Sequence, residues 1–269
     1  MKRSVETLKY ASEADLCDQF ISYAGTKGWV CYPETASWDI LLVRKTDGYQ
    51  IGVQAKMQAN LEVLTQAVRH DRWRGTGPDF HAVLVPVYSG KIGLIQDLAP
   101  HIAVTVIAAR GPGPVDRHNR VKLDYNYGYG KMSCFDPDLP AEGEPWQTQD
   151  WFERCPEARC RLPEYVPDVQ AGVPAPVQLT AWKIAAIKIA ILLERRGVVT
   201  RADFKSIGID HRRWIAAGPS SILTPDPPRG FKQRPEGKPG MGFREEHPRN
   251  YVEIAADFEK WAPTATDLL

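Results

Sequence analysis

The chain has 269 residues, 43% of them hydrophobic, and a formal net charge of +1 at pH 7. This length allows one large domain or two smaller ones with a buried core. The sequence contains no apolar run of about 18 residues, so a membrane-spanning helix is not expected. The first residues lack the apolar stretch of a secretory signal, and five irregularly spaced cysteines do not suggest a disulfide framework. We therefore expect a protein of the reducing cytoplasm.

Helix and strand patterns alternate over residues 1–110. Apolar residues at helical spacing predict a first helix that Ser12 caps and that ends before Gly28. The further elements expected are a strand at 29–32, strands at 38–44 and 49–56, a helix at 60–70, a strand buried on both faces at 80–88, a helical turn at 93–98 and a strand at 102–109. This order is typical of one mixed α/β domain. From 111 to 176 the periodicity fades, and we expect an irregular extension and connector there.

The two strands of an expected hairpin are separated by Asp-Gly at 47–48, a strong signal for a two-residue turn. Counting outward from that turn places Leu41 opposite Gln54 and Asp39 opposite Lys56. Directly opposed side chains lie about 5 Å apart. Asp39, Gln54 and Lys56 are therefore expected to cluster at one end of the hairpin.

An acid on the first helix indicates the same site. At about 100° per residue, Glu13 falls on the apolar face with Phe20 and Ala24. Burying a carboxylate costs several kcal/mol unless it is paired or binds a metal, so a divalent cation shared with Asp39 would account for it. The alternatives are that the first turn frays into solvent, or that the acid interacts favourably with the helix dipole.

Glu13, Asp39 and the tripeptide Gln54-Ala55-Lys56 together resemble the active-site motif of the PD-(D/E)XK, or restriction-endonuclease-like, nuclease superfamily. In that family a helix supplies one acid, a hairpin strand supplies an aspartate, and the next strand supplies an acid-x-Lys pair. The resemblance implies a restriction-endonuclease-like mixed sheet flanked by helices. It also implies that the protein is a metal-dependent deoxyribonuclease that hydrolyses phosphodiester bonds.

The resemblance further implies a role for each residue of the motif. Glu13 and Asp39 would ligate Mg²⁺ or Mn²⁺, with the side-chain carbonyl of Gln54 and the backbone carbonyl of Ala55 as further ligands. Lys56 would orient or deprotonate the attacking water and offset negative charge in the transition state. Mg²⁺ suits this chemistry because it prefers hard oxygen ligands and bridges to phosphate.

Two positions depart from the family pattern, since Trp38 replaces the usual proline and Gln54 replaces the usual acid. Glu34, just beyond a strand end, could supply the missing charge or could be a solvated loop acid. Gln66 and His70, four residues apart on the next helix, resemble an auxiliary motif that touches substrate or orients the lysine. The alternative for that pair is a polar helix surface.

A second domain is expected at 177–269. Its first three helices are predicted at 180–196, 200–207 and 211–217, with Thr180, Thr200 and Asp210 as their caps. This spacing resembles a helix-turn-helix unit. A strand at 222–223, a basic loop to 242 and a return strand at 251–254 suggest a wing. Together these elements predict a winged helix-turn-helix-like nucleic-acid-binding domain.

Between residues 195 and 244 there are eleven Lys and Arg but four acids, an excess of seven positive charges. Such an excess in a nearly neutral chain is typical of a surface that binds phosphates. The residues expected to bind DNA are Arg201, Lys205, His211, Arg212, Arg213, Arg229, Lys232 and Arg234. A helix-turn-helix favours duplex DNA over RNA. A solvated surface and a winged helix that binds protein are the alternatives.

The domain order and the Gln-x-Lys motif are similar to those of the strand-cleaving nuclease subunit of heteromeric transposases. That family places far more chain between its first glutamate and its aspartate, and a phage or defence-system DNA endonuclease fits nearly as well. Two other functions compete: a non-catalytic DNA-binding protein on a nuclease-like scaffold, and an assembly protein whose winged helix recruits a protein partner. Cutting both strands of a duplex would usually need two active sites, which is compatible with a homodimer.

Overall fold

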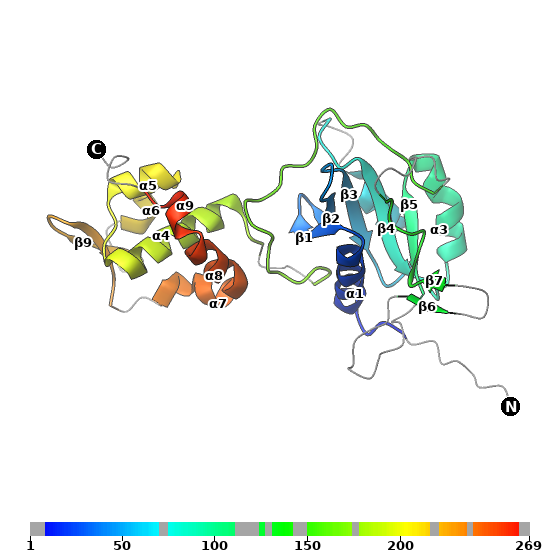
Figure 1. The fold of residues 1–269 in the computed structure, drawn as a ribbon, viewed down its shortest axis with the longest axis horizontal. Coiled ribbons are helices and arrows are strands. Elements are labelled where there is room, and N and C mark those ends of the chain that lie inside the picture. Colours follow the sequence, from blue (N-terminus) through cyan, green and yellow to red (C-terminus); the bar gives the residue numbers. More distant parts are fainter. Residues whose placement is uncertain are drawn as a thin grey trace. The chain divides into compact units, whose positions relative to one another are not determined.

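The structure is a computed structural model in which the chain divides into two compact units (Figure 1). The first unit comprises Met1–Leu162 and Gln170–Pro176, and the second comprises Pro163–Val169 and Val177–Leu269. The residues that the structure describes are 9–69, 75–110, 124–126, 131–141, 150–173, 178–215, 221–235 and 239–263. The two units are treated below one at a time.

The first unit is built on a mixed six-stranded sheet with the order β1-β2-β3-β4-β5-β8 (Figure 1). Its strands are β1 (Trp29–Thr35), β2 (Trp38–Arg44), β3 (Gln50–Ala55), β4 (Phe80–Pro86), β5 (Thr105–Ala109) and β8 (Phe135–Asp136). β1, β2 and β3 are antiparallel neighbours. β3, β4 and β5 run parallel, and β8 is antiparallel to β5.

Helices cover both faces of this sheet. α1 (Glu13–Thr26) packs on one face and shares a core with strand residues such as Ile40, Val53 and Leu84. On the other face lie α2 (Leu61–Val68), α3 (Ile92–Leu98) and the short 3-10 helix η2 (Ala99–Ile102). The expectation of a mixed α/β sheet flanked by helices is thus confirmed.

Local capping explains where α1 and α2 begin. The Ser12 hydroxyl accepts a hydrogen bond from the N–H of Asp15 (3.1 Å), and the Asn60 side chain accepts one from Val63 (3.1 Å). Each cap satisfies an N–H group that a helix N-terminus leaves without an intrahelical partner. Capping by Ser12 makes Glu13 the first residue of α1.

The β2–β3 hairpin forms, but the predicted two-residue turn at 47–48 is wrong. The ladder ends with a hydrogen bond from the N–H of Arg44 to the carbonyl of Tyr49 (2.8 Å), so the loop comprises residues 45–48. The Asp47 carboxylate accepts hydrogen bonds from the Arg44 guanidinium and from the Tyr49 N–H. These side-chain bonds stabilise a longer loop than the Asp-Gly signal indicates.

The longer loop changes the hairpin register by two residues. Leu41 pairs with Gly52, whereas the sequence predicts Gln54 in that place. Because side chains alternate with a period of two, an even shift leaves each residue on its expected face of the sheet. The faces of Asp39 and Lys56 are therefore unaffected by the wrong register.

A tight turn at residues 36–37 joins β1 to β2. Thr35 pairs with Trp38, and Ala36 and Ser37 have φ values of 54° and 68°. Positive φ at both central residues is the type I′ geometry, whose twist matches that of the flanking strands. β1 therefore reaches Thr35, three residues beyond its expected end at 32.

The described part of the expected extension packs against the sheet. Trp151 is buried in the core beside Phe80, with ring centroids 5.9 Å apart. The guanidinium of Arg159 lies 2.8 Å from the buried carboxylate of Asp79. Two short strands in this region pair with each other, β6 (Asp124–Asn126) and β7 (Lys131–Ser133). Residues 150–162 are thus an integral layer of the first unit.

The second unit is mainly helical. Its helices are α4 (Ala181–Arg196), α5 (Arg201–Ile207), α6 (Arg212–Ile215), η3 (Pro239–Gly242), α7 (Phe243–Glu246), α8 (Pro248–Ala256) and α9 (Phe258–Trp261). Thr180 and Thr200 cap α4 and α5, and Thr200 forms a capping box with Asp203. The Asp210 carboxylate accepts a hydrogen bond from the N–H of Arg212 (2.9 Å) at the start of α6. None of the helices in the described ranges is long and apolar enough to cross a bilayer.

A β-hairpin follows the first three helices of the second unit. It consists of β9 (Leu223–Asp226) and β10 (Gly230–Gln233), and Phe231 also pairs with Val199. The return strand predicted at 251–254 is wrong, because these residues lie in α8, where Tyr251 and Ile254 are buried against α4. A short apolar run does not distinguish strand from helix by periodicity, and here packing of one helical face decides.

Candidate active site

Adjoining ends of α1, β2 and β3 bring together three residues of the motif. Asp39, near the start of β2, accepts a hydrogen bond through Oδ2 from the N–H of Ala55 (2.8 Å). Lys56 follows directly, and its Nζ lies 3.5 Å from Oε1 of Glu13. We call Glu13, Glu34, Asp39, Gln54 and Lys56 the acidic cluster.

The contact between Lys56 and Glu13 is loose. The two side chains are 32% and 23% exposed, and their separation of 3.5 Å is at the long limit of a hydrogen bond. Ion pairs that remain accessible to solvent contribute about 0–1 kcal/mol. Little free energy is therefore needed to separate the pair, which leaves both groups available to bind a ligand.

Gln54 is held by the turn that precedes β2. Its buried side chain donates a hydrogen bond through Nε2 to the carbonyl of Ser37 (2.8 Å). A backbone carbonyl only accepts hydrogen bonds, so this contact fixes which end of the amide faces Ser37. A carboxylate in the same place would face the carbonyl oxygen without a proton between them. The local geometry thus favours glutamine over the acid that is usual in the motif.

Glu34 lies opposite Asp39 in the β1–β2 hairpin, between two paired positions. Its Oε1 accepts a hydrogen bond from the N–H of Gly172 (3.1 Å), and its side chain is half-buried. Glu34 belongs to β1 and is not a solvated loop acid, so that alternative is wrong. A third carboxylate therefore lies beside the predicted pair.

Burial makes the three carboxylates harder to ionise, and repulsion by neighbouring acids adds to this effect at Glu13 and Glu34. Burial raises the pKa of Asp39 and, with the charge of Asp39, that of Glu13, although Lys56 lowers both. Burial also raises the pKa of Glu34 to about 7, and the charges of Asp39 and Glu13 add to that shift. A cation bound among these groups would relieve their repulsion.

The oxygen atoms of the acidic cluster suit a hard divalent cation. Glu13, Glu34 and Asp39 offer carboxylate oxygens and Gln54 offers an amide oxygen, all donors that Mg²⁺ prefers. Within the described ranges, no three His, Cys, Asp or Glu side chains are grouped closely enough to hold an ion. A cation here would therefore need amide, main-chain or water oxygens as well, and Mg²⁺ commonly retains several waters.

Gln66, the described member of the auxiliary pair, is not joined to the acidic cluster by any interaction between described residues. Gln66 lies on α2, and its Oε1 is buried without a hydrogen-bond partner among the described groups. No hydrogen bond or ion pair between described residues connects it to Asp39 or Lys56. His70 lies outside the described residues.

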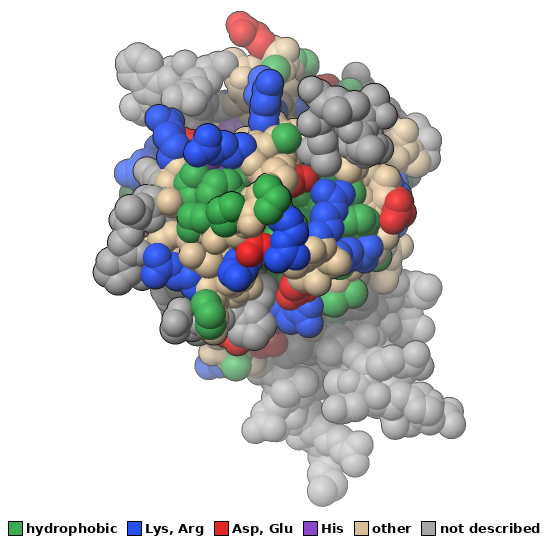
Figure 2. Space-filling model, turned by 90° about the vertical axis from the view of Figure 1, so that its left-hand side faces the viewer, with side chains coloured by type: hydrophobic (Ala, Val, Ile, Leu, Met, Phe, Trp, Pro, Cys, Tyr) green, Lys and Arg blue, Asp and Glu red, His purple; other side chains and the backbone are tan. Residues whose placement is uncertain are grey.

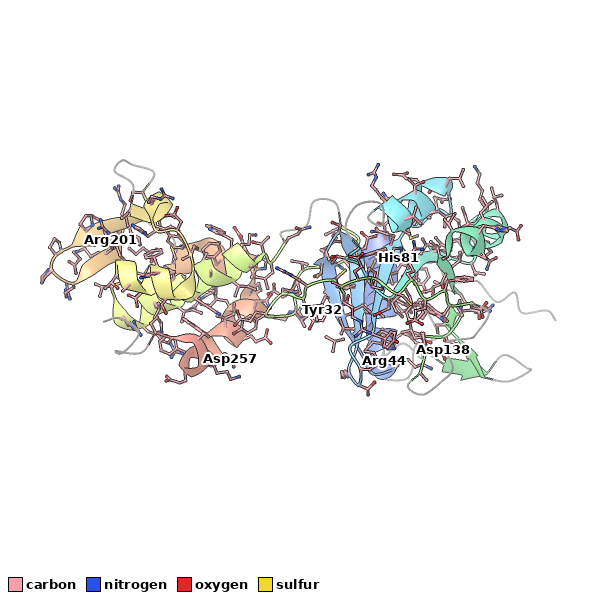
Figure 3. The ribbon with its side chains drawn as sticks, turned by 90° about the horizontal axis from the view of Figure 1, so that it is seen from above. Tyr32, Arg44, His81, Asp138, Arg201 and Asp257 are labelled. Atoms are coloured by element: carbon pink, nitrogen blue, oxygen red, sulfur yellow. The ribbon has the colours of Figure 1, made fainter. Side chains whose placement is uncertain are left out.

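The predicted DNA-binding residues lie on α5, on α6 and around the β9–β10 hairpin of the second unit. Arg201 and Lys205 are exposed on α5, and no ion pair between described residues involves either one (Figure 3 labels Arg201). His211 and Arg234 are half-buried, and the side chain of Arg213 lies outside the described part of the chain. Figure 2 shows Lys and Arg side chains around an apolar area on one face of this unit.

Other predicted DNA-binding residues are already paired with acids. The guanidinium of Arg212 lies 2.7 Å from the carboxylate of Asp210. On the hairpin, Arg229 and Lys232 lie 2.6 and 3.4 Å from the carboxylate of Asp226. Asp210 and Asp226 thus pair with cations at α6 and at the hairpin, whereas Arg201 and Lys205 on α5 have no ion pair with a described residue.

Two contributors to the acidic cluster are absent from the sequence motif. The carbonyl of Ser37 and the N–H of Gly172 both act through the main chain, so residue type does not reveal them. Gly172 is also 138 positions away from Glu34 in the sequence. The residue type itself gives one indication, because Gly172 has a positive φ of 72°, a conformation that glycine adopts readily.

No protein-family model, no curated protein and no solved structure matches this chain. What the protein does is therefore inferred from its own residues, above all from Glu13, Asp39 and Lys56.

Proposed function

We propose that the protein is a metal-dependent DNA endonuclease that hydrolyses phosphodiester bonds. The meeting of Glu13, Asp39 and Lys56 at adjoining ends of α1, β2 and β3 supports this most strongly. Partly dehydrated carboxylates repel a phosphate unless a cation lies between them, and a neighbouring lysine suits an anionic substrate. The same residue types on a helix and two hairpin strands form the motif of the PD-(D/E)XK superfamily.

Each residue of the motif has a separate task in this proposal. Asp39 and Glu13 would hold Mg²⁺ or Mn²⁺, with the amide oxygen of Gln54 and the carbonyl of Ala55 as neutral ligands. The ion, when bound, supplies charge neutralisation and an activated water. Lys56, released from Glu13, donates hydrogen bonds to the attacking water or the phosphate and offsets the developing negative charge.

The order of elements in the first unit is consistent with this assignment. α1 precedes three antiparallel strands, and β4 and β5 then run parallel to β3 with helices on both faces. A helix followed by a mixed sheet is also the core of restriction-endonuclease-like nucleases. We propose that fold for the first unit.

For the second unit we propose a winged helix that binds duplex DNA. α4, α5 and α6 are followed by the β9–β10 hairpin, which is the order of a helix-turn-helix with a wing. The exposed cations Arg201 and Lys205 suit contacts with phosphates, which provide most of the sequence-independent affinity for DNA. The alternative for this unit is that it binds a protein partner. A homodimer would supply the two active sites that cleavage of both DNA strands usually needs.

Plasmid nicking tests the proposal directly. Purified protein with Mg²⁺ or Mn²⁺ should convert supercoiled plasmid to the open-circular form. Asp39→Ala and Lys56→Ala should each reduce the rate by about 100-fold or more, since each removes a group that acts on the transition state. Lys45→Ala is the matched control, because Lys45 is an exposed lysine in the loop of the same hairpin.

A non-catalytic DNA-binding protein is the second candidate, and one observation favours it. Gln54 is neutral and donates to Ser37, so the cluster has one acid fewer than the usual motif at this position. DNA binding with no cleavage of any DNA form in any metal would establish this alternative. If the protein cleaves DNA, the form of DNA that it cuts would indicate whether it acts in transposition, in phage DNA processing or in defence.

A further inference from the structure

The β9–β10 hairpin of the second unit is fixed at its base and exposed at its tip. Leu223 is buried in the helical core, and Phe231 exchanges two main-chain hydrogen bonds of 2.8 Å with Val199, just before α5. Gly230 permits this contact, because a Cβ there would lie 2.5 Å from the carbonyl oxygen of Val199. The tip, residues 227–229, is exposed, and Figure 1 shows the hairpin extending away from the helices of its unit. The base thus holds the tip in a fixed place relative to those helices.

The tip is the tripeptide Pro227-Pro228-Arg229, and its main chain offers no N–H group that still needs a partner. Proline has no N–H, and the N–H of Arg229 donates to the carbonyl of Asp226 (2.8 Å). Moving an unpaired N–H out of water costs free energy, and this tip would not incur that cost. The proline rings also restrict φ, so little conformational entropy is lost when the tip is held in one place. These properties suit insertion into an apolar space from which water is excluded.

The charged groups beside the tip leave it weakly positive. The carboxylate of Asp226 lies 2.6 Å from Arg229 and 3.4 Å from Lys232, so one acid faces two cations. The Asp226 side chain is only 14% exposed, whereas those of Arg229 and Lys232 are 69% and 50% exposed. An apolar end with a weakly positive border fits a ligand that has an apolar interior and an anionic border. Stacked base pairs between two phosphate backbones are such a ligand.

We propose that the hairpin tip is a wedge that enters duplex DNA from the minor groove, separates two stacked base pairs and kinks the duplex. This inference rests on the proposed function of the second unit, because it assumes that this unit binds DNA. Proline is among the side chains that proteins insert between base pairs in this way, and the kinks that result are about 20–90°. The cations of α5 would then hold the phosphates while the tip changes the shape of the DNA.

The test measures the bend directly. The full chain is mixed, in EDTA to prevent cleavage, with a DNA duplex that carries a fluorescent dye at each end. Energy transfer between the dyes should rise on binding, by an amount that corresponds to a kink of about 20° or more. Pro227→Ser with Pro228→Ser gives the tip two main-chain N–H groups and two hydroxyls, and this double variant should bind DNA without bending it. Its slope of log K against log salt should be unchanged, because neither proline carries a charge.

Pro248→Ser is the matched control. Pro248 is an exposed proline at the first position of α8, where a helix does not use the N–H, so this variant should bend DNA as the native chain does. Circular dichroism and the melting temperature report whether each variant is folded. Should the double variant fail to fold, the native chain is tested on a duplex with one central mismatch. That duplex should bind about tenfold more tightly than the fully paired one, because a mismatched step costs less to unstack.

The outcomes separate this inference from the proposed function. Binding of DNA without a bend, or an equal bend by the folded double variant, would overturn the wedge and leave a second unit that binds DNA. A smaller salt slope in the double variant would also overturn it, since the tip would then act on phosphates. Equal affinity for the mismatched and the paired duplex would have the same meaning. A native chain that binds no duplex DNA would overturn the wedge and the proposed DNA binding together, and would favour a protein partner for this unit.

Discussion

At the scale of single residues, main-chain groups decide which side chain each position of the acidic cluster accepts. Ser37 offers a carbonyl to position 54, and that carbonyl requires a donor. Gly172 offers an N–H to position 34, and that N–H requires an acceptor. The identity of Gln54 and Glu34 follows from these two partners as much as from the chemistry of the site.

Gln54→Glu should therefore destabilise the protein although it restores the usual acid of the motif. The new carboxylate would face the Ser37 carbonyl at the position where Nε2 now donates over 2.8 Å. A buried acceptor left without a donor costs about 1–3 kcal/mol. Urea unfolding of metal-free protein measures the loss, and Gln96→Glu at an exposed glutamine on α3 serves as the control. A variant as stable as the native chain at pH 8 would contradict the assigned orientation of Gln54.

The raised pKa of Glu34, about 7 and caused mainly by burial, predicts a pH-dependent stability. Between the unfolded value of about 4.3 and this folded value, the folded state binds more protons than the unfolded state. The free energy of unfolding therefore falls as pH rises through that window. Glu34→Gln removes the titrating group and should flatten the dependence between about pH 5 and 8, measured by urea unfolding in EDTA. An unchanged slope would show that Glu34 does not titrate as its surroundings indicate.

At the scale of elements, the local sequence was sufficient to predict where helices begin, because a capping side chain binds the main chain of the first helical turn. The caps at Ser12, Thr180 and Thr200 form as the sequence predicts, because each cap accepts a hydrogen bond from the N–H three residues ahead. The hairpin loop was mispredicted because Asp47 binds Arg44, a contact that the Asp-Gly pattern does not encode.

Features that depend on contacts between distant segments could not be predicted from local sequence patterns. The residues at 251–254 have the β-branched and aromatic character of a strand, but their burial against α4 makes them helical. The site itself was partly predictable, since Glu13, Asp39 and Lys56 form a spaced motif. The contribution of Gly172 was not predictable, because it depends on a backbone contact between segments 138 positions apart.

The tight turn at residues 36–37 predicts a stabilising substitution. Ala36 and Ser37 have φ values of 54° and 68°, a conformation that costs L-residues other than Asn and Gly roughly 1–2 kcal/mol each. Replacing the pair by Asn-Gly, the preferred type I′ sequence, should raise the free energy of unfolding by about 1 kcal/mol. Thermal melting would reveal the change, and the same pair placed at 45–46 in the other hairpin loop is the control. A lower melting temperature would contradict the turn type.

At the scale of the whole molecule, charge is distributed unevenly on the second unit. Arg212 on α6 is paired with Asp210, and Arg229 and Lys232 of the β9–β10 hairpin are paired with Asp226. Arg201 and Lys205 on α5 have no ion pair with a described residue. Bound phosphate would have to compete with an acid at the paired positions. The first contacts with DNA are therefore expected at α5.

Arg201→Glu on α5 should weaken binding to duplex DNA more than Arg212→Glu on α6 does. Each lost phosphate contact should also reduce the slope of log K against log salt by about 0.9. Fluorescence anisotropy over a range of salt concentrations measures both quantities, with Lys45→Glu in the first unit as the control for net charge. Equal losses for the α5 and α6 variants would show that the ion pair of Arg212 does not restrain it.

The division of the chain between its two units has a consequence for dissecting the protein. Residues 163–169 pack with the second unit and 170–176 with the first, so the polypeptide passes from one unit to the other three times. A fragment that ends at Leu162 lacks the segment that reaches Glu34, and one that ends at Pro176 retains seven residues that belong elsewhere. No single break in the backbone yields two complete halves. Experiments that fuse, cleave or exchange parts of the protein should therefore keep both units together in one polypeptide.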